Sequence, residues 1–414
     1  MKKDKMMDHL FRHQFGKMVS ILTRIFGLHN LETIEDAVQD TFVKAMLSWR
    51  NQVPDNPEAW LMQAAKNRTI DLFRKLSAEQ KRVPKIENGP SSIKIHDLFL
   101  DTEIEDSQLR MIFTACHPSL NPKDQISFAL KTISGFSSQE IASSLLLKEE
   151  TIKKRLTRAR KSITQQELAF EIPSGKELPN RLARVQEVLY LIFNEGFHSN
   201  RKNILIRKEL CGEAIRLCKM LLKNNFTRQP STYALFALMC FHSARLDSKV
   251  DENNEIIDLR NQDRSKWHFP LVKLGNVTMN KAVDTEAFTS YHYEAAIAAE
   301  HLMARNFEST NWDKILQWCQ QLYALQPAPI TLLNMAVVEM QRENLDAVKE
   351  LLDSIDPVTL EQRAYLYFGS YAEYFLKKKA YKKALAEIEK ALETVRNDAE
   401  RNYLLKKKTE WLLS

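Results

Sequence analysis

A stretch near the N-terminus combines the side-chain types that contact single-stranded nucleic acid. An amide and a carboxylate one helical turn apart can hydrogen-bond base edges, and neighbouring cations can neutralise phosphates. An indole upstream could stack on an unpaired base, or it could simply belong to the core. These residues are Trp60, Asn67, Arg68, Asp71, Arg74 and Lys75. The pattern predicts a surface that could hold melted DNA.

A second stretch, residues 148–163, is strongly basic and completes a helix-turn-helix pattern. Asn121-Pro122 opens one helix, and Ser137 or Ser138 caps a short second helix over residues 139–145. The basic stretch is then the recognition helix, whose cations would contact phosphates on either side of the major groove. The candidate residues are Lys148, Thr151, Lys153, Lys154, Arg155, Arg158 and Lys161, and Arg160 is also expected to be exposed. The alternative is a solvated basic helix.

Residues 35–45 predict an amphipathic helix with an acidic side. Ala37, Val38, Phe42 and their neighbours line one apolar stripe, whereas Glu35, Asp36 and Asp40 make the other side acidic. From this segment alone, the acidic side is most simply interpreted as a solvated face. The next helix is expected from Pro57, with Asn56 as its N-cap, to Lys75.

These helices fall into blocks that predict the domain organisation. Helical periodicity covers residues 8–76, fades in a linker over residues 77–106, resumes over 107–166, and returns from 177 to 414. The chain has 9 glycines and 13 prolines in 414 residues, too few for a turn-rich fold. We therefore expect an all-α protein with two small helical modules and a long helical C-terminal domain.

The composition narrows the classes of function. The net charge of +7 is compatible with nucleic-acid binding. Five scattered cysteines and ten histidines show neither Cys-x-x-Cys nor His-Glu-x-x-His metal spacing, so we expect no metal and no cofactor. Because no apolar run reaches the ~18 residues that a membrane span needs, we expect no membrane contact and a cytoplasmic location.

The order of these motifs resembles a known family. Residues 35–45, Asn56-Pro57-Glu58-Ala59-Trp60-Leu61 and Lys66-Asn67-Arg68-Thr69-Ile70-Asp71 resemble region 2 of extracytoplasmic-function (ECF) sigma factors. Residues 109–120 with the helix-turn-helix behind them resemble region 4. The C-terminal half, including residues 188–197 and 261–267, is similar to a subgroup that carries a tetratricopeptide-like (TPR) domain.

The resemblance implies partners and residue roles. Asp36, Asp40 and Phe42 would contact core RNA polymerase, through its β′ and β subunits. Trp60, Asn67, Asp71 and the cations beside them would recognise and melt the −10 element of promoter DNA. Residues 148–161 would engage the −35 element, and the protein would have no catalytic activity.

The C-terminal half shows weak repeats. Phe375, Tyr381, Ala384, Ile388 and Ala391 match the tetratricopeptide spacing, and Met335, Ala336, Ala347 and Leu351 give a poorer copy. Stacked helix pairs would offer a concave face to a protein or peptide partner, or they could be purely structural. Within this half, Gln262, Asp263 and Arg264 form a polar loop that either fixes local structure or contacts the N-terminal modules.

Three functions follow from these patterns. The leading hypothesis is a sigma factor regulated by its C-terminal domain. The second is a helix-turn-helix regulator that senses a peptide and works without polymerase. The third, an enzyme in the C-terminal half, lacks any Gly-rich phosphate loop, nucleophile elbow or metal motif.

Overall fold

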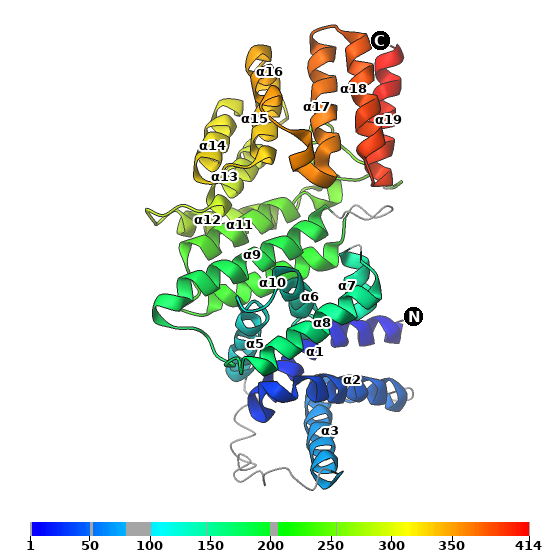
Figure 1. The fold of residues 1–414 in the computed structure, drawn as a ribbon, viewed down its shortest axis with the longest axis vertical. Coiled ribbons are helices and arrows are strands. Elements are labelled where there is room, and N and C mark those ends of the chain that lie inside the picture. The colour runs from blue at the N-terminus through cyan, green and yellow to red at the C-terminus, as the bar shows by residue number, and fades with distance from the viewer. Residues whose placement is uncertain are drawn as a thin grey trace. The chain divides into compact units, whose positions relative to one another are not determined.

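The computed structural model describes residues 2–49, 53–79, 101–145, 147–198, 206–253 and 255–413. The regular elements of these residues are all helices, which confirms the expected all-α class (Figure 1). The chain divides into two compact units, Met1–Leu191 and Ile192–Ser414. Most of the expected linker, residues 80–100, lies outside the described residues.

The first unit begins with an N-terminal module of three helices. They are α1 (Lys2–Phe26), α2 (Leu31–Ser48) and α3 (Pro57–Glu79), with the short 3₁₀ turn η1 (Leu28–Asn30) between the first two. Met18, Leu22, Ile34, Val38 and Leu61 are fully buried where the helices meet. Asn56 caps α3, as predicted, because its side chain accepts a hydrogen bond from the Ala59 amide at 3.0 Å.

A helix-turn-helix module follows. Its helices are α5 (Asp101–Ala115), α6 (Pro122–Thr132), α7 (Ser138–Ser144) and α8 (Glu149–Gln165). Ser137 caps α7 in a capping box with Glu140, and Ile141, Ala142 and Ile152 are buried where α7 crosses α8. The predicted helix-turn-helix is therefore present. Helix α5 starts at Asp101, six residues before the expected resumption at Ser107, because Ile104 already packs in the core.

The two modules of the first unit pack against each other. Helix α1 contacts α5 and α6, and η1 contacts α8. At Gly16 of α1 the approach is so close that an added Cβ would lie 1.8 Å from the Ile133 carbonyl oxygen. Arg24 at the other end of α1 pairs with Glu103 and with Asp106, the latter at 3.2 Å. We call this contact between the modules the packed arrangement.

Helix α9 (Leu178–Phe197), after the 3₁₀ turn η2 (Gly175–Glu177), contains the boundary between the units. Its first turns belong with the helix-turn-helix module. The Arg181 guanidinium donates to the Phe113 carbonyl oxygen at 3.0 Å, and Arg184 donates to Gln125 at 2.6 Å. Residues 177–191, which we assigned from the sequence to the C-terminal domain, thus lie in the first compact unit.

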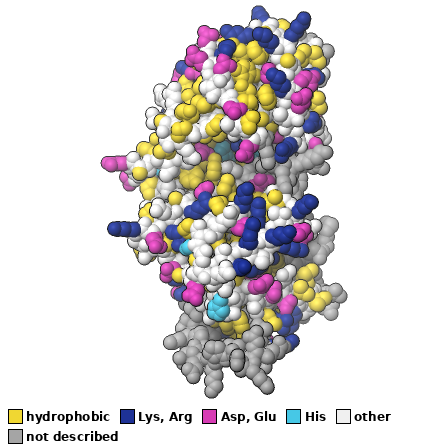
Figure 2. Space-filling model, viewed as in Figure 1, with side chains coloured by type: hydrophobic (Ala, Val, Ile, Leu, Met, Phe, Trp, Pro, Cys, Tyr) yellow, Lys and Arg dark blue, Asp and Glu magenta, His cyan; other side chains and the backbone are white. Residues whose placement is uncertain are grey.

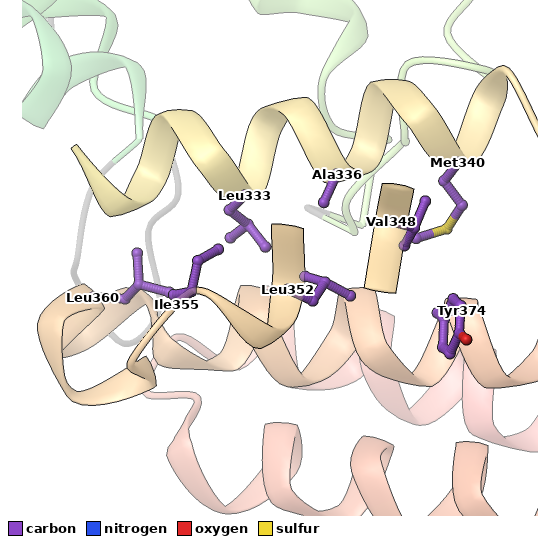
Figure 3. Close-up of a cluster of buried hydrophobic side chains, with 8 residues drawn as sticks. All are labelled: Leu333, Ala336, Met340, Val348, Leu352, Ile355, Leu360 and Tyr374. Atoms are coloured by element: carbon purple, nitrogen blue, oxygen red, sulfur yellow. The ribbon is translucent and has the colours of Figure 1, made fainter. Parts of the chain in front are cut away.

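The second unit is a series of helices in which neighbours along the chain pack in pairs. Each pair buries apolar side chains that neither helix could cover alone. One such core joins α15, α16 and α17, with Leu333, Val348 and Leu352 at its centre (Figure 3). The helices are α10 (Lys208–Lys223), α11 (Pro230–Ser243), α12 (Phe269–Ala282), α13 (Ser290–Met303), α14 (Trp312–Leu325), α15 (Pro329–Gln341), α16 (Leu345–Asp353), α17 (Ala364–Lys377), α18 (Tyr381–Thr394) and α19 (Asp398–Leu413), and the 3₁₀ turns are η3 (Leu246–Ser248), η4 (Arg264–Lys266) and η5 (Pro357–Arg363).

The residues that suggested repeats lie only partly in the cores of these pairs, since Tyr381 is 48% exposed and the remaining ones outside the core are half-buried, namely Phe375, Met335, Ala347 and Leu351. Ala384, Ile388 and Ala391 are buried on α18 against α17, and Ala336 is buried on α15 against α16. Small residues at such positions let two helices approach closely. The helix-pair organisation therefore agrees with the spacing, while the assignment to the tetratricopeptide class stays a prediction.

Candidate nucleic-acid interface

A groove of about 620 Å³ lies between α2 and α3 and gathers most of the polar residues predicted in this module. Trp60 is half-buried, with its ring edge-on to Trp49 at 5.2 Å, and it still lines the groove. The position of Trp60 is compatible with either interpretation, and stacking on a base stays a prediction. The groove is lined by Asp40, Thr41, Val43, Lys44, Leu47, Trp60, Gln63, Ala64, Asn67, Arg68 and Asp71.

An ion pair joins the two walls of this groove. The Arg68 guanidinium donates to one carboxylate oxygen of Asp40, with Nη2 at 2.6 Å and Nε at 3.1 Å. The two side chains are 46% and 52% exposed, so the pair adds little to stability. Its significance is positional, because a residue predicted to bind polymerase meets a residue predicted to bind DNA.

The remaining predicted residues of α3 stay at the surface. Asn67 accepts a hydrogen bond from Gln63 at 3.1 Å, and Arg74 lies 3.9 Å from Asp71. Lys75 is also exposed. Side chains this accessible can exchange their present partners for a ligand at small cost.

The structure separates the three residues predicted to contact polymerase. Asp36 and Asp40 are exposed on α2. Partial desolvation of the Asp36 carboxylate, together with the negative charges of Glu32 and Asp40, raises the pKa of Asp36. Phe42 is 3% exposed and packs edge-on against Phe11 at 4.7 Å, so it supports the helix from below. A direct contact from Phe42 to a partner would require this side chain to leave the core.

Sequence reasoning missed an apolar patch on α2. Val43, Met46 and Leu47 are 52%, 56% and 58% exposed, next to the groove. The signal was available, since these residues lie off the apolar stripe that packs on α1 and α3. Exposed apolar side chains beside carboxylates are typical of a protein-binding surface.

Helix α8 presents its cations opposite a narrow apolar stripe. Ile152, Leu156, Ala159 and Ile163 are buried on one side. Figure 2 shows Lys and Arg side chains gathered over the part of the molecule that contains α8. The predicted residues Lys148, Lys153, Lys154, Arg158 and Lys161 are exposed, and Thr151 and Arg155 are half-buried.

Several of these cations already have partners within the helix-turn-helix module. Arg158 pairs at 2.8 Å with Asp124, whose side chain is 5% exposed, and Arg155 donates to the Lys123 carbonyl oxygen at 3.3 Å. Lys154 pairs with Glu150 one turn earlier at 2.8 Å, in the open. Burial lowers the pKa of Arg155, although Asp124 raises it. Lys154 and Lys161 are therefore better placed than Arg158 to contact phosphate without disturbing the fold.

Arg160 is the exception on α8, because its side chain lies against α2. We expected Arg160 on the exposed surface and Glu35 on the acidic outer side of α2, and both predictions were wrong. The two side chains form an ion pair, in which the Glu35 side chain is 4% exposed. Glu32 lies 3.8 Å from the same guanidinium. Burial raises the pKa of Glu35 even though Arg160 lowers it. Burial also lowers the pKa of Arg160, but Glu35, Glu32 and Asp36 together raise it overall. The pair ties the two modules together.

The polar loop at residues 262–264 has a structural role. Arg264 donates to the carbonyl oxygens of His301 and Ala304 at 2.9 and 2.7 Å, which caps the C-terminal end of α13, and it lies over the Trp267 ring. Asp263 accepts from the Ser265 amide at 2.9 Å, and the Ser265 hydroxyl and amide lower its pKa. Gln262 donates to the Ile257 carbonyl oxygen at 3.1 Å.

The cysteines are buried thiols. All five are buried, and desolvation raises the pKa of Cys116 to about 12, so this thiol stays protonated. Within the described ranges, no group of three or more His, Cys, Asp or Glu side chains could hold a metal ion. In the same ranges, no helix is both long enough and apolar enough to span a bilayer.

Comparison with known families divides the chain into three parts. Residues 10–79 match sigma-70 region 2, residues 110–163 match sigma-70 region 4, and residues 181–283 match a family of unknown function (DUF6596). The first match coincides with the N-terminal module and the second with the helix-turn-helix module. The part that contains the 262–264 loop belongs to the third match.

Three relatives extend this picture. An uncharacterized protein of Rhizobium meliloti (strain 1021) is 32% identical over 343 residues, 82% of this chain and 80% of that protein. The ECF RNA polymerase sigma factor SigE of Mycolicibacterium smegmatis is 27% identical over 38% of this chain and 59% of its own length. The ferric citrate uptake sigma factor FecI of Escherichia coli (strain K12) is 28% identical over 37% of this chain and 85% of its own. No solved structure matches the chain.

The Glu35–Arg160 pair predicts a pH-dependent loss of stability. In Arg160→Gln the buried Glu35 carboxylate loses its partner, so the free energy of unfolding at pH 7 should fall by about 3–5 kcal/mol. Without Arg160 the pKa of Glu35 rises further above its ordinary 4.5. The penalty should then shrink as the pH falls through this raised pKa, because the folded protein takes up a proton first. Urea denaturation at pH 5 and 7 measures both effects.

The double variant Glu35→Gln/Arg160→Gln provides the reference, because it removes both charges. Its stability should exceed that of Arg160→Gln at pH 7, and the difference should narrow at pH 5. Lys161→Gln, which removes an exposed charge from the same helix, should change little. A difference that does not vary with pH would contradict a buried, unpaired carboxylate.

Proposed function

Because the chain belongs to the RNA polymerase sigma factors, in one family with the Rhizobium meliloti relative, we propose that its two modules divide promoter recognition between them. In this proposal the N-terminal module binds core polymerase and opens the −10 element, and the helix-turn-helix module reads the −35 element. A sigma factor is a transcription initiation factor without catalytic activity of its own. The partners are core polymerase and promoter DNA.

The polymerase contact would lie on the outer surface of α2. Asp36 and Asp40 supply negative charge, and the exposed Val43, Met46 and Leu47 supply apolar area. Charge would orient the encounter, and the apolar side chains would supply most of the affinity. This combination of charge and apolar area supports a contact with the β′ and β subunits of polymerase better than it supports a solvated face.

The −10 contact would lie in the groove between α2 and α3. Trp60 could stack on an unpaired base, while Asn67 and Asp71 could hydrogen-bond base edges. Three exposed cations beside them could neutralise the DNA phosphates, namely Arg68, Arg74 and Lys75. The observation that carries the proposal is the Asp40–Arg68 pair, because it puts the predicted polymerase and DNA surfaces side by side on one small module.

The −35 contact would use the exposed side of α8. Lys148, Lys153, Lys154 and Lys161 would neutralise phosphates, and Thr151, Arg155 and Arg158 lie along the same helix. Arg158 would either exchange its salt bridge with Asp124 for a contact with DNA or keep that salt bridge and stabilise the helix-turn-helix. A helix of this length, Glu149–Gln165, can lie across a major groove.

We further propose that the second unit regulates transcription in cis. Support comes from its position on the same chain and from its helix pairs, which are typical of protein-binding repeats. Within the 262–264 loop, the hydrogen bonds of Arg264 to His301 and Ala304 support a local structural role. A protein or peptide partner is the ligand class that such repeats favour.

Run-off transcription with purified core polymerase tests the proposed function. The full chain should direct promoter-specific transcripts, and Asp71→Ala should reduce them roughly 5- to 150-fold, the loss expected for one base-edge contact. Asp55→Ala, on the exposed loop before α3, is the matched control and should leave the yield unchanged. Duplex binding without any affinity for core polymerase would instead favour the polymerase-independent regulator.

Lys154→Ala tests the basic side of α8. Its salt bridge to Glu150 joins two side chains that are 72% and 74% exposed, so the substitution should not destabilise the fold. Duplex binding should weaken about equally for all sequences, and the slope of log K against log salt should fall by about 1. Lys176→Ala, exposed in η2 outside the helix-turn-helix, should leave the slope unchanged. An unchanged slope for Lys154→Ala would remove this residue from the DNA contact.

Truncation tests regulation by the second unit. Ending the chain after His198 keeps α9, whose Arg181 and Arg184 hold it to the helix-turn-helix module. Promoter output in cells should change by on the order of fivefold or more, the lower end of usual allosteric coupling. Circular dichroism of the purified fragment checks that its helices persist. Unchanged output from a folded fragment would argue against regulation in cis.

A further inference from the structure

The second unit contains a pocket of about 290 Å³ that the proposed transcription function does not use. It lies among α17, α18 and α19, closed on one side by Ile256, Asp258 and His198. Its volume is at the small end of the range for ligand pockets, enough for a molecule of amino-acid size. Residues far apart in the sequence thus converge on one cavity.

The pocket has an apolar and aromatic body. Ile388 and Leu404 are buried at its base, Leu366 is 38% exposed, and the rings of Tyr403 and Trp411 add flat surface. Gly369 keeps one wall open, because an added Cβ there would meet only the tip of Leu404, at 3.9 Å. Such a lining accepts an aliphatic or aromatic body, and its rings can face a cation.

The polar groups of the pocket are mainly carboxylates. Glu400 is 6% exposed and accepts hydrogen bonds from the Tyr365 hydroxyl and, at 2.6 Å, from the His198 ring. Asp258 accepts from the Tyr403 hydroxyl at 3.4 Å and from the Asn261 amide at 3.0 Å. Neither carboxylate forms a salt bridge with a lysine or arginine in the described part of the chain.

The one lysine of the pocket is already neutralised. Lys407 pairs with Glu373, and although burial lowers its pKa, this carboxylate and Tyr403 raise it overall. Burial and the neighbouring Glu400 raise the pKa of Tyr365, so this hydroxyl stays protonated and donates to Glu400. Among the described lining residues, Asp258 and Glu400 thus stand beside the apolar body without a lysine or arginine salt bridge, although Glu400 is bonded to His198 and interacts electrostatically with Lys249.

We propose that this pocket binds an organic cation, a protonated amine or guanidinium carried on a small apolar or aromatic body. The cation would approach Asp258 and Glu400, and the body would fill the space beside Leu366, Gly369 and Trp411. This chemistry has two sources, a free amine and a basic side chain of a protein segment. The site lies wholly within the second unit, and its occupation does not depend on polymerase or DNA.

Isothermal titration calorimetry of the full chain tests the charge requirement with three probes of similar shape. 2-Phenylethylamine should bind, and 2-phenylethanol and phenylacetate should bind at least about tenfold more weakly, since a buried charge contact is worth this much or more. Equal affinity for the amine and the alcohol would overturn the proposal, and so would tighter binding of the anion or no binding of any cationic probe.

A second titration, with peptides, distinguishes a free amine from a basic side chain of a protein segment as the natural ligand. Acetyl-Phe-Arg-amide is compared with its citrulline analogue, which keeps the shape and loses the charge. Tighter binding of the arginine peptide than of 2-phenylethylamine supports a protein segment as the natural ligand, and the reverse order supports a free amine. Both orders uphold the cation site, provided that the citrulline peptide binds more weakly.

Two pairs of variants locate the binding. Glu400→Gln and Asp258→Asn should each weaken the amine about tenfold or more, whereas Glu410→Gln, exposed on the same helix as Glu400, should not. Gly369→Leu should fill the pocket and abolish binding, and Gly212→Leu, where an added Cβ meets no atom within 4 Å, is its control. If the amine binds Gly369→Leu as tightly as the unaltered chain, the pocket is not its site. If the chain failed to direct transcription with core polymerase, the result of these binding experiments would still stand.

Discussion

The buried ion pair between Glu35 and Arg160 is the interaction on which the first unit depends. It joins α2 of the N-terminal module to α8 of the helix-turn-helix module across 125 residues of sequence. Two charges taken out of water stabilise a structure only when they meet in good geometry, and loss of either one leaves the other costly. The pair therefore selects one arrangement of the modules more than it adds to total stability.

This constraint bears directly on promoter recognition. Elements centred about 25 base pairs apart are separated by about 85 Å along B-form DNA, at 3.4 Å a step. Two modules in contact cannot reach both elements, so the proposed binding requires the packed arrangement to open. The Glu35–Arg160 pair, the Arg24 pairs and the buried contact of α1 with α5 and α6 together set the free energy of that opening.

Local signals made the helices predictable from the sequence. The caps at Asn56, Asn121 and Ser137 all form, and the start of α3 at Pro57 is as expected. Contacts over long sequence separations carry no such signal. The exposure of Arg160 was predicted wrongly because a basic residue on a basic helix gives no hint of a buried partner. Phe42 was placed by resemblance, although its position on the apolar stripe already indicated burial. The pocket of the second unit could not be predicted at all, because its lining runs from His198 to Trp411.

The glycine at position 16 has a further consequence. Its hydrogen faces the Ile133 carbonyl oxygen where every other residue would place carbon, so α1 can lie against the end of α6 only while this position has no side chain. A methyl group at this position would clash with the Ile133 carbonyl oxygen and push α1 away from the end of α6. A substitution as small as alanine at this position should therefore disfavour the contact between the modules, without any change to the surfaces that would meet polymerase or DNA.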